Sequence, residues 1–388
     1  MNAFRRCTAP ACLIVPLLLM LLVLAAGLLA GCGSSEGVAT TIPAATATGP
    51  AAPSTTPGDP VTFTDQAGRA VTIPAVIDTV YGTSPIATNL LYMLAPDKLA
   101  GWNFEPVTVE KQYLLPQYAS LPNLGGWYGK NNTGSIEEII KVAPDIILNV
   151  GTIDDTAKAQ SEKIQEQLKI PVVMVDGSLV NSGDTFRYVG ALLGVEERAE
   201  ELAAYCDGVI QEAEANAAQL SESQKVAVYY AEGNKGLNTD PSGSMHTEVL
   251  DLLGAVNVAQ VSNASGYGMA DVSLEQVVAW DPAVILVASD PTQETAVWQH
   301  VTSSSDWSVI AAVKNNAVYQ IPHGPFDWFD RPPCTARILG IRWVGSLLYP
   351  DLCQYDMKAE VRKFYELFYQ IDLTDEQLAA LTVNAGVK

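Results

Sequence analysis

Three histidines, His246, His300 and His323, are the only imidazole groups in this chain, and they limit its metal chemistry. None of them has a second histidine four residues away, the spacing that places two ligands on one face of a helix. A bare zinc or manganese site, which needs several converging histidines and carboxylates, is therefore not predicted. A single axial bond from His246 or His323 to an already chelated metal is easier to form, although either residue can also be an ordinary loop histidine. His300 stands among Gln, Thr and Ser and is expected to face solvent.

Motifs of enzyme active sites are missing from the sequence. It contains no G-x-S-x-G, no H-E-x-x-H, no P-loop and no G-x-G-x-x-G after a strand. Gly82-Thr-Ser-Pro85 follows an expected strand, but it lacks the second glycine of a nucleophile turn and has no identifiable base. Glu232, Asp327 and Asp330 could supply a catalytic carboxylate pair, as many residues of an acidic chain could. We therefore expect no enzyme, and an exported enzyme remains an alternative.

The charge balance excludes some partners. The chain has 22 Lys and Arg against 43 Asp and Glu, a formal net charge of −21. Nucleic acids and anionic lipid surfaces repel such a protein. We expect no nucleic-acid partner.

The N-terminus has the pattern of a bacterial export signal. Arg5 and Arg6 precede an apolar run, which ends in Leu29-Ala-Gly-Cys32, the pattern of a lipoprotein cleavage box. Cys32 is then the lipidated first residue of the mature protein, and the run is also long enough for an uncleaved membrane anchor. Residues 33–60 are rich in Ala, Thr, Pro, Ser and Gly and are expected to form a flexible tether. Both alternatives place the folded part outside the cytoplasm, attached to the outer face of the membrane.

Three cysteines remain after the signal: Cys206, Cys334 and Cys353. This odd number does not indicate a disulfide framework. Cys334 and Cys353 flank an expected helix, which would separate them by roughly 28 Å. We expect buried free thiols.

One stretch occurs twice, at a constant offset of 138 residues: Ser135-Ile-Glu137 through Pro144 to Leu148, and Ser273-Leu-Glu275 through Pro282 to Leu286. Each copy is expected to begin with a serine-capped helix that its proline ends. A short β-branched strand, buried on both faces, follows. An offset of this length is too long for a solenoid repeat and indicates two similar lobes.

The remaining pattern alternates strands and helices, which predicts α/β lobes with parallel sheets. Residues 61–74 are expected to form a hairpin, and residues 184–220 a long helix with a break near Gly190 and Gly194. The predicted segments are the signal peptide 1–31, the lipidated tether 32–60, an N-terminal lobe 61–183, the connecting helix 184–220 and a C-terminal lobe 221–388 with closing helices.

In this order, the pieces resemble the substrate-binding lipoproteins of ABC importers for iron-siderophores, haem and cobalamin. The resemblance covers residues 60–388 and depends on the hairpin, the doubled unit, the connecting helix and the aromatic tail around Phe364 to Tyr369. It implies two Rossmann-like lobes joined by a single long helix, with a ligand cleft between them.

The resemblance also implies partners. In that family a glutamate on each lobe pairs with arginines of the permease, and Glu137 and Glu275 match those positions. The purely structural alternative is that both carboxylates only stabilise helix N-termini. A permease dimer with a cytoplasmic ATPase, a monomeric binding protein and no cofactor are the corresponding expectations.

The implied cargo is a metal chelate, with a ferric siderophore first and haem or cobalamin as further candidates. Aromatic loop residues would hold its planar faces, and Arg331 would pair with a ligand carboxylate. The alternative for Phe326 and Trp328 is that they fill the space under a long loop. The predicted ligand-binding residues are Ser84, Trp102, Trp127, Tyr128, Tyr230, His246, Tyr267, His323, Phe326, Trp328 and Arg331. A protein that binds bare transition metal, or a sensor with the same fold, is the alternative function.

Overall fold

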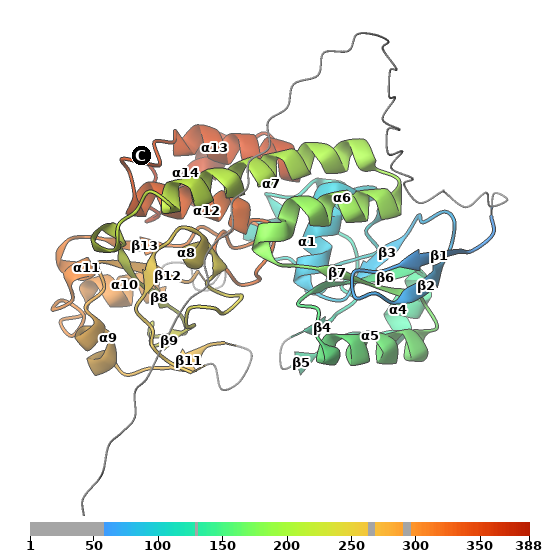
Figure 1. Ribbon diagram of the computed structural model, residues 1–388, viewed down its shortest axis with the longest axis horizontal. Helices are drawn as coiled ribbons and strands as arrows, with labels where there is room; N and C mark the ends of the chain where they lie inside the picture. The colour runs from blue at the N-terminus through green and yellow to red at the C-terminus, as the bar shows by residue number, and fades with distance from the viewer. Residues whose placement is uncertain (1–57, 129–130, 263–267, 290–295) are drawn as a thin grey trace, which may run out of the picture. The chain divides into compact units, whose positions relative to one another are not determined.

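The computed structural model describes residues 58–128, 131–262, 268–289 and 296–388 (Figure 1). All of them belong to one compact unit, Ser54–Lys388. Two separate parallel sheets, one in each half of the sequence, form the centres of two α/β lobes. Within the described residues, no helix combines the length and the apolar character needed to cross a membrane.

The N-terminal lobe contains a three-stranded parallel sheet in the order β3-β6-β7, and an antiparallel hairpin, β1-β2, precedes it. The hairpin was predicted, and its turn places Gly68 at a φ of 78°. The elements of this lobe are β1 (Val61–Thr64), β2 (Ala70–Ile73), β3 (Val80–Gly82), α1 (Pro85–Leu94), η1 (Pro96–Lys98), α2 (Thr108–Lys111), α3 (Pro116–Ala119), β4 (Trp127–Tyr128), β5 (Asn131–Asn132), α4 (Ile136–Val142), β6 (Ile146–Gly151), α5 (Asp155–Leu168), β7 (Val172–Asp176) and η2 (Leu179–Asn181).

The C-terminal lobe contains a four-stranded parallel sheet in the order β10-β8-β12-β13. A short antiparallel pair, β9 and β11, lies outside this sheet. The elements of this lobe are η3 (Glu222–Gln224), β8 (Ala227–Ala231), β9 (Asn238–Thr239), α8 (Glu248–Leu252), β10 (Val256–Asn257), β11 (Ala270–Asp271), α9 (Leu274–Trp280), β12 (Val284–Val287), α10 (Ala296–Ser303), α11 (Ala311–Lys314), β13 (Val318–Gln320), α12 (Arg337–Leu348), α13 (Met357–Phe364), the π-helical turn η4 (Tyr365–Tyr369) and α14 (Asp375–Leu381).

The doubled stretch folds into the same motif in both lobes, as predicted. Ser135 and Ser273 cap α4 and α9, and each side-chain oxygen accepts a hydrogen bond from the backbone N–H three residues later. Each helix is followed by a left-handed residue directly before the proline, Ala143 or Asp281, with φ of 47° and 42°. The strands β6 and β12 then lie inside their sheets and are almost wholly buried.

Two helices, α6 (Ser182–Leu193) and α7 (Glu196–Ala217), connect the lobes. The predicted break lies at Gly194, which has a φ of 69°. Gly190 stays inside α6, where an added Cβ would lie 2.2 Å from the Cβ of Ala199, so it permits close packing of the two helices. The helix α7 packs beside α6 and runs along α12 to α8 of the C-terminal lobe (Figure 1).

The C-terminal helices pack an aromatic cluster against the N-terminal lobe. Tyr369 in η4 accepts a hydrogen bond from Tyr92 of α1 through its carbonyl oxygen, and its hydroxyl accepts one from Asn89. Phe364 and Phe368 stack with ring centroids 4.3 Å apart. Trp343 in α12 is wholly buried, and its indole N–H donates to the carbonyl of Ala385. The chain's last segments thus contribute to the core.

One further expectation has a clear outcome. Cys206, Cys334 and Cys353 are free and buried, as predicted.

Residues 99–102 do not form a continuous strand. Leu99 and Trp102 form only isolated bridges, to Val80 and Asn123. Between them, a Cβ on Gly101 would lie 2.5 Å from the carbonyl oxygen of Pro122, so this backbone lies against a loop rather than in a continuous ladder.

Candidate ligand-binding site

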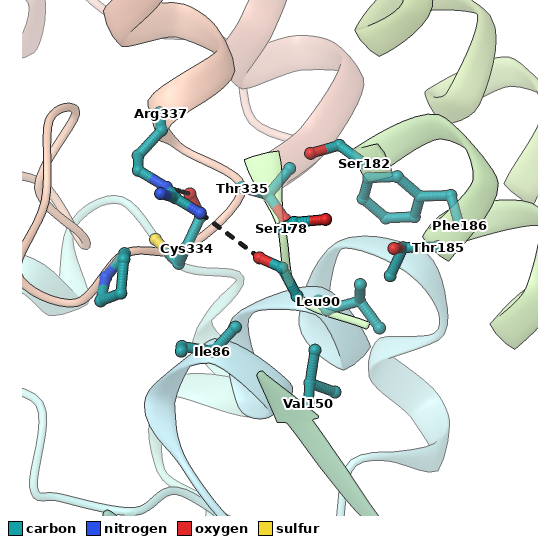
Figure 2. A pocket seen from close by; sticks show the side chains of 12 residues that line it. Ile86, Leu90, Val150, Ser178, Ser182, Thr185, Phe186, Cys334, Thr335 and Arg337 are labelled. Carbon is teal, nitrogen blue, oxygen red and sulfur yellow. Dashed lines mark hydrogen bonds between the residues drawn. The ribbon is translucent and has the colours of Figure 1, made fainter. Parts of the chain in front are cut away.

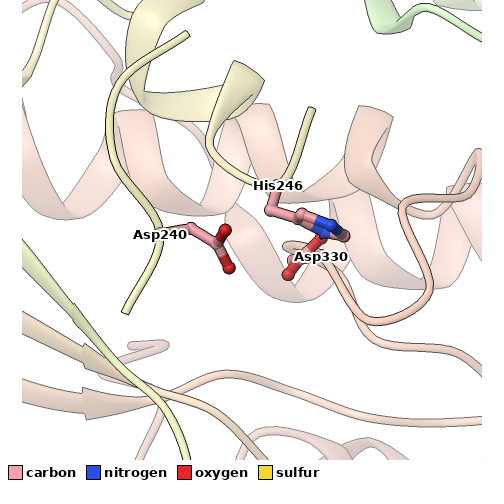
Figure 3. A group of neighbouring side chains, drawn as sticks. All are labelled: Asp240, His246 and Asp330. Carbon is pink, nitrogen blue, oxygen red and sulfur yellow. The ribbon is translucent and has the colours of Figure 1, made fainter. Parts of the chain in front are cut away.

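Three potential metal ligands converge in the C-terminal lobe: Asp240, His246 and Asp330 (Figure 3). One ligand atom from each residue lies within 4.8 Å of those of the other two. His246 Nδ1 lies 2.6 Å from Asp330 Oδ1, and Asp330 Oδ2 accepts a hydrogen bond from the hydroxyl of Tyr230. Because an ionised carboxylate can only accept, His246 Nδ1 is the donor, and in the neutral imidazole Nε2 keeps its lone pair. A carboxylate that orients an imidazole in this way is typical of metal-binding histidines.

The guanidinium of Arg331 lies against the same carboxylates. Its Nη2 is 2.6 Å from Asp240 Oδ2, its Nε is 3.3 Å from Asp330 Oδ2, and Nε also donates to Glu232 Oε1. Together the five side chains form the charged group of this lobe: Glu232, Asp240, His246, Asp330 and Arg331. It contains three carboxyl groups and one guanidinium.

Burial changes the acid–base properties of this group. The side chains of Glu232, Asp240 and Asp330 are at most 1% exposed, whereas that of Arg331 is 31% exposed. Burial raises the pKa of Glu232 to about 9, although Arg331 acts in the opposite direction. Burial alone would lower the pKa of Arg331, but the negative charges, Asp330 first, raise it above its usual range. Glu232 therefore holds a proton at neutral pH, and Arg331 stays charged.

Loops at the ends of strands bring these residues together. Glu232 directly follows β8, and a bridge to Asn238 returns the chain so that Asp240 lies beside it. Asp330 belongs to the loop between β13 and α12, where the Asp327 carboxylate accepts hydrogen bonds from the backbone N–H groups of Phe329 and Asp330. The site is thus at the carboxyl end of the sheet, where open α/β sheets bind ligands.

His323 has a different environment from His246. Its Nε2 lies 2.9 Å from Oε1 of Glu110, a buried residue of the N-terminal lobe, so the pair joins the two lobes. Asp327, which bridges to His323, is wholly buried, and burial raises its pKa to about 6. His323 is therefore part of a contact between the lobes, and its predicted role as an axial ligand stays a prediction.

A small cavity also lies between residues of the two lobes (Figure 2). Ser178, Thr185 and Phe186 line it from one lobe, and Cys334 and Arg337 from the other. The buried Arg337 donates to the carbonyls of Gly177 and Met245 and pairs with Glu248. Arg337 therefore links Met245, the residue before His246, to Gly177 of the N-terminal lobe.

Four of the predicted aromatic contacts are core residues in this structure: Trp102, Tyr230, Phe326 and Trp328, each at most 1% exposed. The rings of Trp102 and Phe326 pack on one another across the lobes. Trp328 packs on Trp343 and donates to the hydroxyl of Tyr365. Phe326 and Trp328 therefore fill space under the loop, the alternative that the sequence left open, and a ligand contact stays a prediction for all four.

The other predicted positions differ in exposure. Ser84 is buried as the N-cap of α1, and Trp127 is buried against Tyr81. Tyr128 is 38% exposed and can meet a ligand. Tyr267 and Cys32 lie outside the described residues.

Glu137 and Glu275 are both exposed, and neither has an ion-pair partner among the described residues. They occupy the second positions of α4 and α9, and backbone and serine hydrogen bonds lower the pKa of Glu275. Both carboxylates are therefore free to meet a cationic partner.

Sequence reasoning missed Asp240. It singled out His246 and Arg331 as ligand contacts and named Glu232 and Asp330 only as possible catalytic acids. Asp240 stands in Asn238-Thr-Asp-Pro241, an unremarkable turn sequence, and only the return of the chain beside β8 places it near His246. No local signal could have found it.

Residues 84–324 match the periplasmic binding protein family. The molybdate-binding protein MolA of Haemophilus influenzae is 27% identical over 346 residues, which cover 82% of this chain and 93% of that protein. Its molybdate-bound structure has a TM-score of 0.63, with 22% identity over 81% of this chain and 99% of that one.

Other solved structures are also similar. An ABC transporter solute binding protein from Sulfurospirillum deleyianum has a TM-score of 0.76 and 33% identity, and the match covers 82% of this chain and 98% of that one. CeuE of Helicobacter pylori in a nickel–histidine complex has a TM-score of 0.59 and 15% identity over 82% and 98% of the two chains, a likeness of fold alone.

Proposed function

Because the chain belongs to the periplasmic binding protein family, the substrate-binding proteins of ABC importers, we propose that it captures a metal chelate outside the cytoplasm and delivers it to an ABC permease. The chelate that fits best leaves at least one coordination position of its metal open. Haem and corrin compounds meet this condition, and so does a ferric siderophore with too few donor atoms to surround its iron.

The observation that carries this proposal is the group of Asp240, His246 and Asp330. Imidazole nitrogen and carboxylate oxygen are common ligands of transition metals. His246 is 11% exposed and hydrogen-bonded through Nδ1, so its Nε2 is the atom suited to bind the metal. The charge of the group favours a cationic centre, because its carboxyl groups outnumber its one guanidinium.

An oxyanion is the second candidate cargo, because similarity to the molybdate-binding protein MolA extends over most of the chain. Arg331 and His246 could donate hydrogen bonds to such an anion. Against it, Arg331 is already paired with Glu232 and Asp240, and an anion in this position would meet the negative charges of Asp240 and Asp330. The chelate therefore remains the first candidate.

We further propose that Cys32 carries a lipid anchor and that Glu137 and Glu275 dock the permease. The lipobox supports the anchor. The matched, exposed positions of the two glutamates on the doubled motif support docking by both lobes.

A binding titration of residues 58–388 tests the cargo. Tryptophan fluorescence is measured with ferric siderophores, haem, cobalamins, nickel–histidine, bare divalent metals and molybdate, for wild type and for His246→Ala. We expect saturable one-to-one binding of a chelate that His246→Ala weakens strongly. Binding of molybdate alone would select the oxyanion instead, and turnover of a bound compound would favour the enzyme alternative.

A further inference from the structure

Arg331 occupies the position of a cation in the charged group. Its guanidinium contacts Glu232, Asp240 and Asp330 at once, so it supplies positive charge to carboxyl groups that burial has removed from water. Unpaired buried charges are costly, so these carboxylates need a cation beside them.

The backbone packs tightly against the charged group. Gly268, at a φ of 73°, lies so near that an added Cβ would be 2.2 Å from Asp240 Oδ1 and 2.7 Å from Arg331 Nη2. Glu232 Oε2 is buried and receives no hydrogen bond from an N–H or O–H group of the described residues. This oxygen, in a side chain only 1% exposed, is a further buried polar atom at the same place. The group therefore differs from an acidic patch on the surface.

Arg331 is also its most accessible member. Its side chain is 31% exposed, whereas Asp240 and Asp330 are wholly buried. The guanidinium can therefore move toward solvent by side-chain rotation while the carboxylates remain in place. A metal centre bound to Asp240 would repel a guanidinium in contact with the same carboxylate.

We propose that Arg331 is an exchangeable internal cation. The metal centre of the cargo takes its place against Asp240 and His246 Nε2, with Asp330 orienting the imidazole, and the released guanidinium pairs with anionic oxygens of the chelator. This inference rests on the proposed function, and it adds a basis for selectivity: a bare metal ion displaces Arg331 without offering it a new partner, whereas an anionic chelate offers one.

Two nickel probes separate these cases: Ni²⁺ alone, and nickel nitrilotriacetate, an anionic chelate with open coordination positions. Binding of each to untagged protein is measured by calorimetry, for wild type, Arg331→Gln and His246→Ala. The matched control is Arg342→Gln, which removes an arginine that pairs with Glu212 and Glu360. If Arg331→Gln does not fold, the double variant R331Q/E232Q also removes the buried carboxyl group that Arg331 caps, and the new amide can donate a hydrogen bond to Asp240.

Exchange of Arg331 for the metal predicts opposite changes in the affinities for the two nickel probes. Arg331→Gln, or the double variant, should bind the anionic chelate about tenfold more weakly and free Ni²⁺ several-fold more tightly, and Arg342→Gln should match wild type. Equal changes in affinity for both probes, or no change in either affinity, would overturn the proposed exchange. If wild type binds neither probe nor any other chelate, the cargo assignment itself fails, which is a different result.

Discussion

At the carboxyl ends of β3 and β6 the N-terminal lobe has a network of neutral polar groups, whereas the C-terminal lobe carries charged ones. Thr83, which follows β3, donates to the side chain of Asn149 near the end of β6, which in turn donates to Ser161. The amide of Asn103 donates to the carbonyls of Gly82 and Gly125. These groups are satisfied within their own lobe. The other lobe has the charged group, with a potential metal ligand in His246.

Two lobes with the same sheet type and the same doubled motif can therefore differ in function: both can dock the permease, while one of them binds the metal. Glu137 and Glu275 are matched in position and exposure, so docking is expected to be shared. The charged group has no counterpart among the described residues at the strand ends named for the other lobe. Ligand recognition through the metal is therefore expected from one lobe only.

Removal of His246, or of the carboxylate that orients it, should have the largest effect. His246→Ala and Asp330→Asn are expected to weaken chelate binding by up to about 100-fold, because one removes the coordinating nitrogen and the other the carboxylate that orients it. Calorimetry with the identified chelate is the measurement, and His300→Ala, an exposed histidine on α10, is the matched control. A full loss from His300→Ala, or none from His246→Ala, would contradict the assignment to the C-terminal lobe.

Docking should respond equally to changes in the two lobes. Glu137→Ala and Glu275→Ala are each expected to reduce uptake in cells, and the double variant to abolish it, without a change in ligand affinity. Glu162→Ala with Glu214→Ala changes the net charge by the same amount at exposed positions and serves as the control. If the double variant also lost ligand binding, or retained normal uptake, the docking assignment would fail.

Stability should depend on pH through Glu232. Its pKa rises from 4.5 to about 9 on folding, so between these values the native state holds a proton that the unfolded state has lost. Stability then falls as pH rises through this window, by up to about 1.4 kcal/mol per pH unit. Glu232→Gln should flatten that dependence in denaturant unfolding from pH 5 to 9. An identical slope in the variant would show that Glu232 is ionised in the folded protein.

The smallest expected effect is a change in stability at the left-handed residues that follow α4 and α9. Ala143→Gly is expected to stabilise the protein by about 1 kcal/mol, because a left-handed residue with a side chain is strained. Asp281→Gly should gain less or lose stability, because Asp281 Oδ1 accepts a hydrogen bond from the backbone N–H of Ala311. Urea unfolding measures the stability of both variants. An equal increase in stability would show that the hydrogen bond of Asp281 does not distinguish the two copies.

Sequence patterns predicted much of the fold because its signals are local. Ser135, Pro144 and their copies defined the helix–strand motif, and Gly194 marked the break between the connecting helices. The site was predicted only in part, because long-range packing decides it. Burial of Phe326 and Trp328 depends on the C-terminal aromatic helices, and Asp240 reaches His246 only through the return of the chain after β8.

The most direct test of the central claim is an anomalous diffraction map of crystals of the protein with its bound metal chelate. The account predicts a metal peak about 2 Å from His246 Nε2 and close to a carboxylate oxygen of Asp240, with Arg331 turned toward the chelator. A metal peak away from His246, with Arg331 still against Asp240 and Glu232, would contradict it.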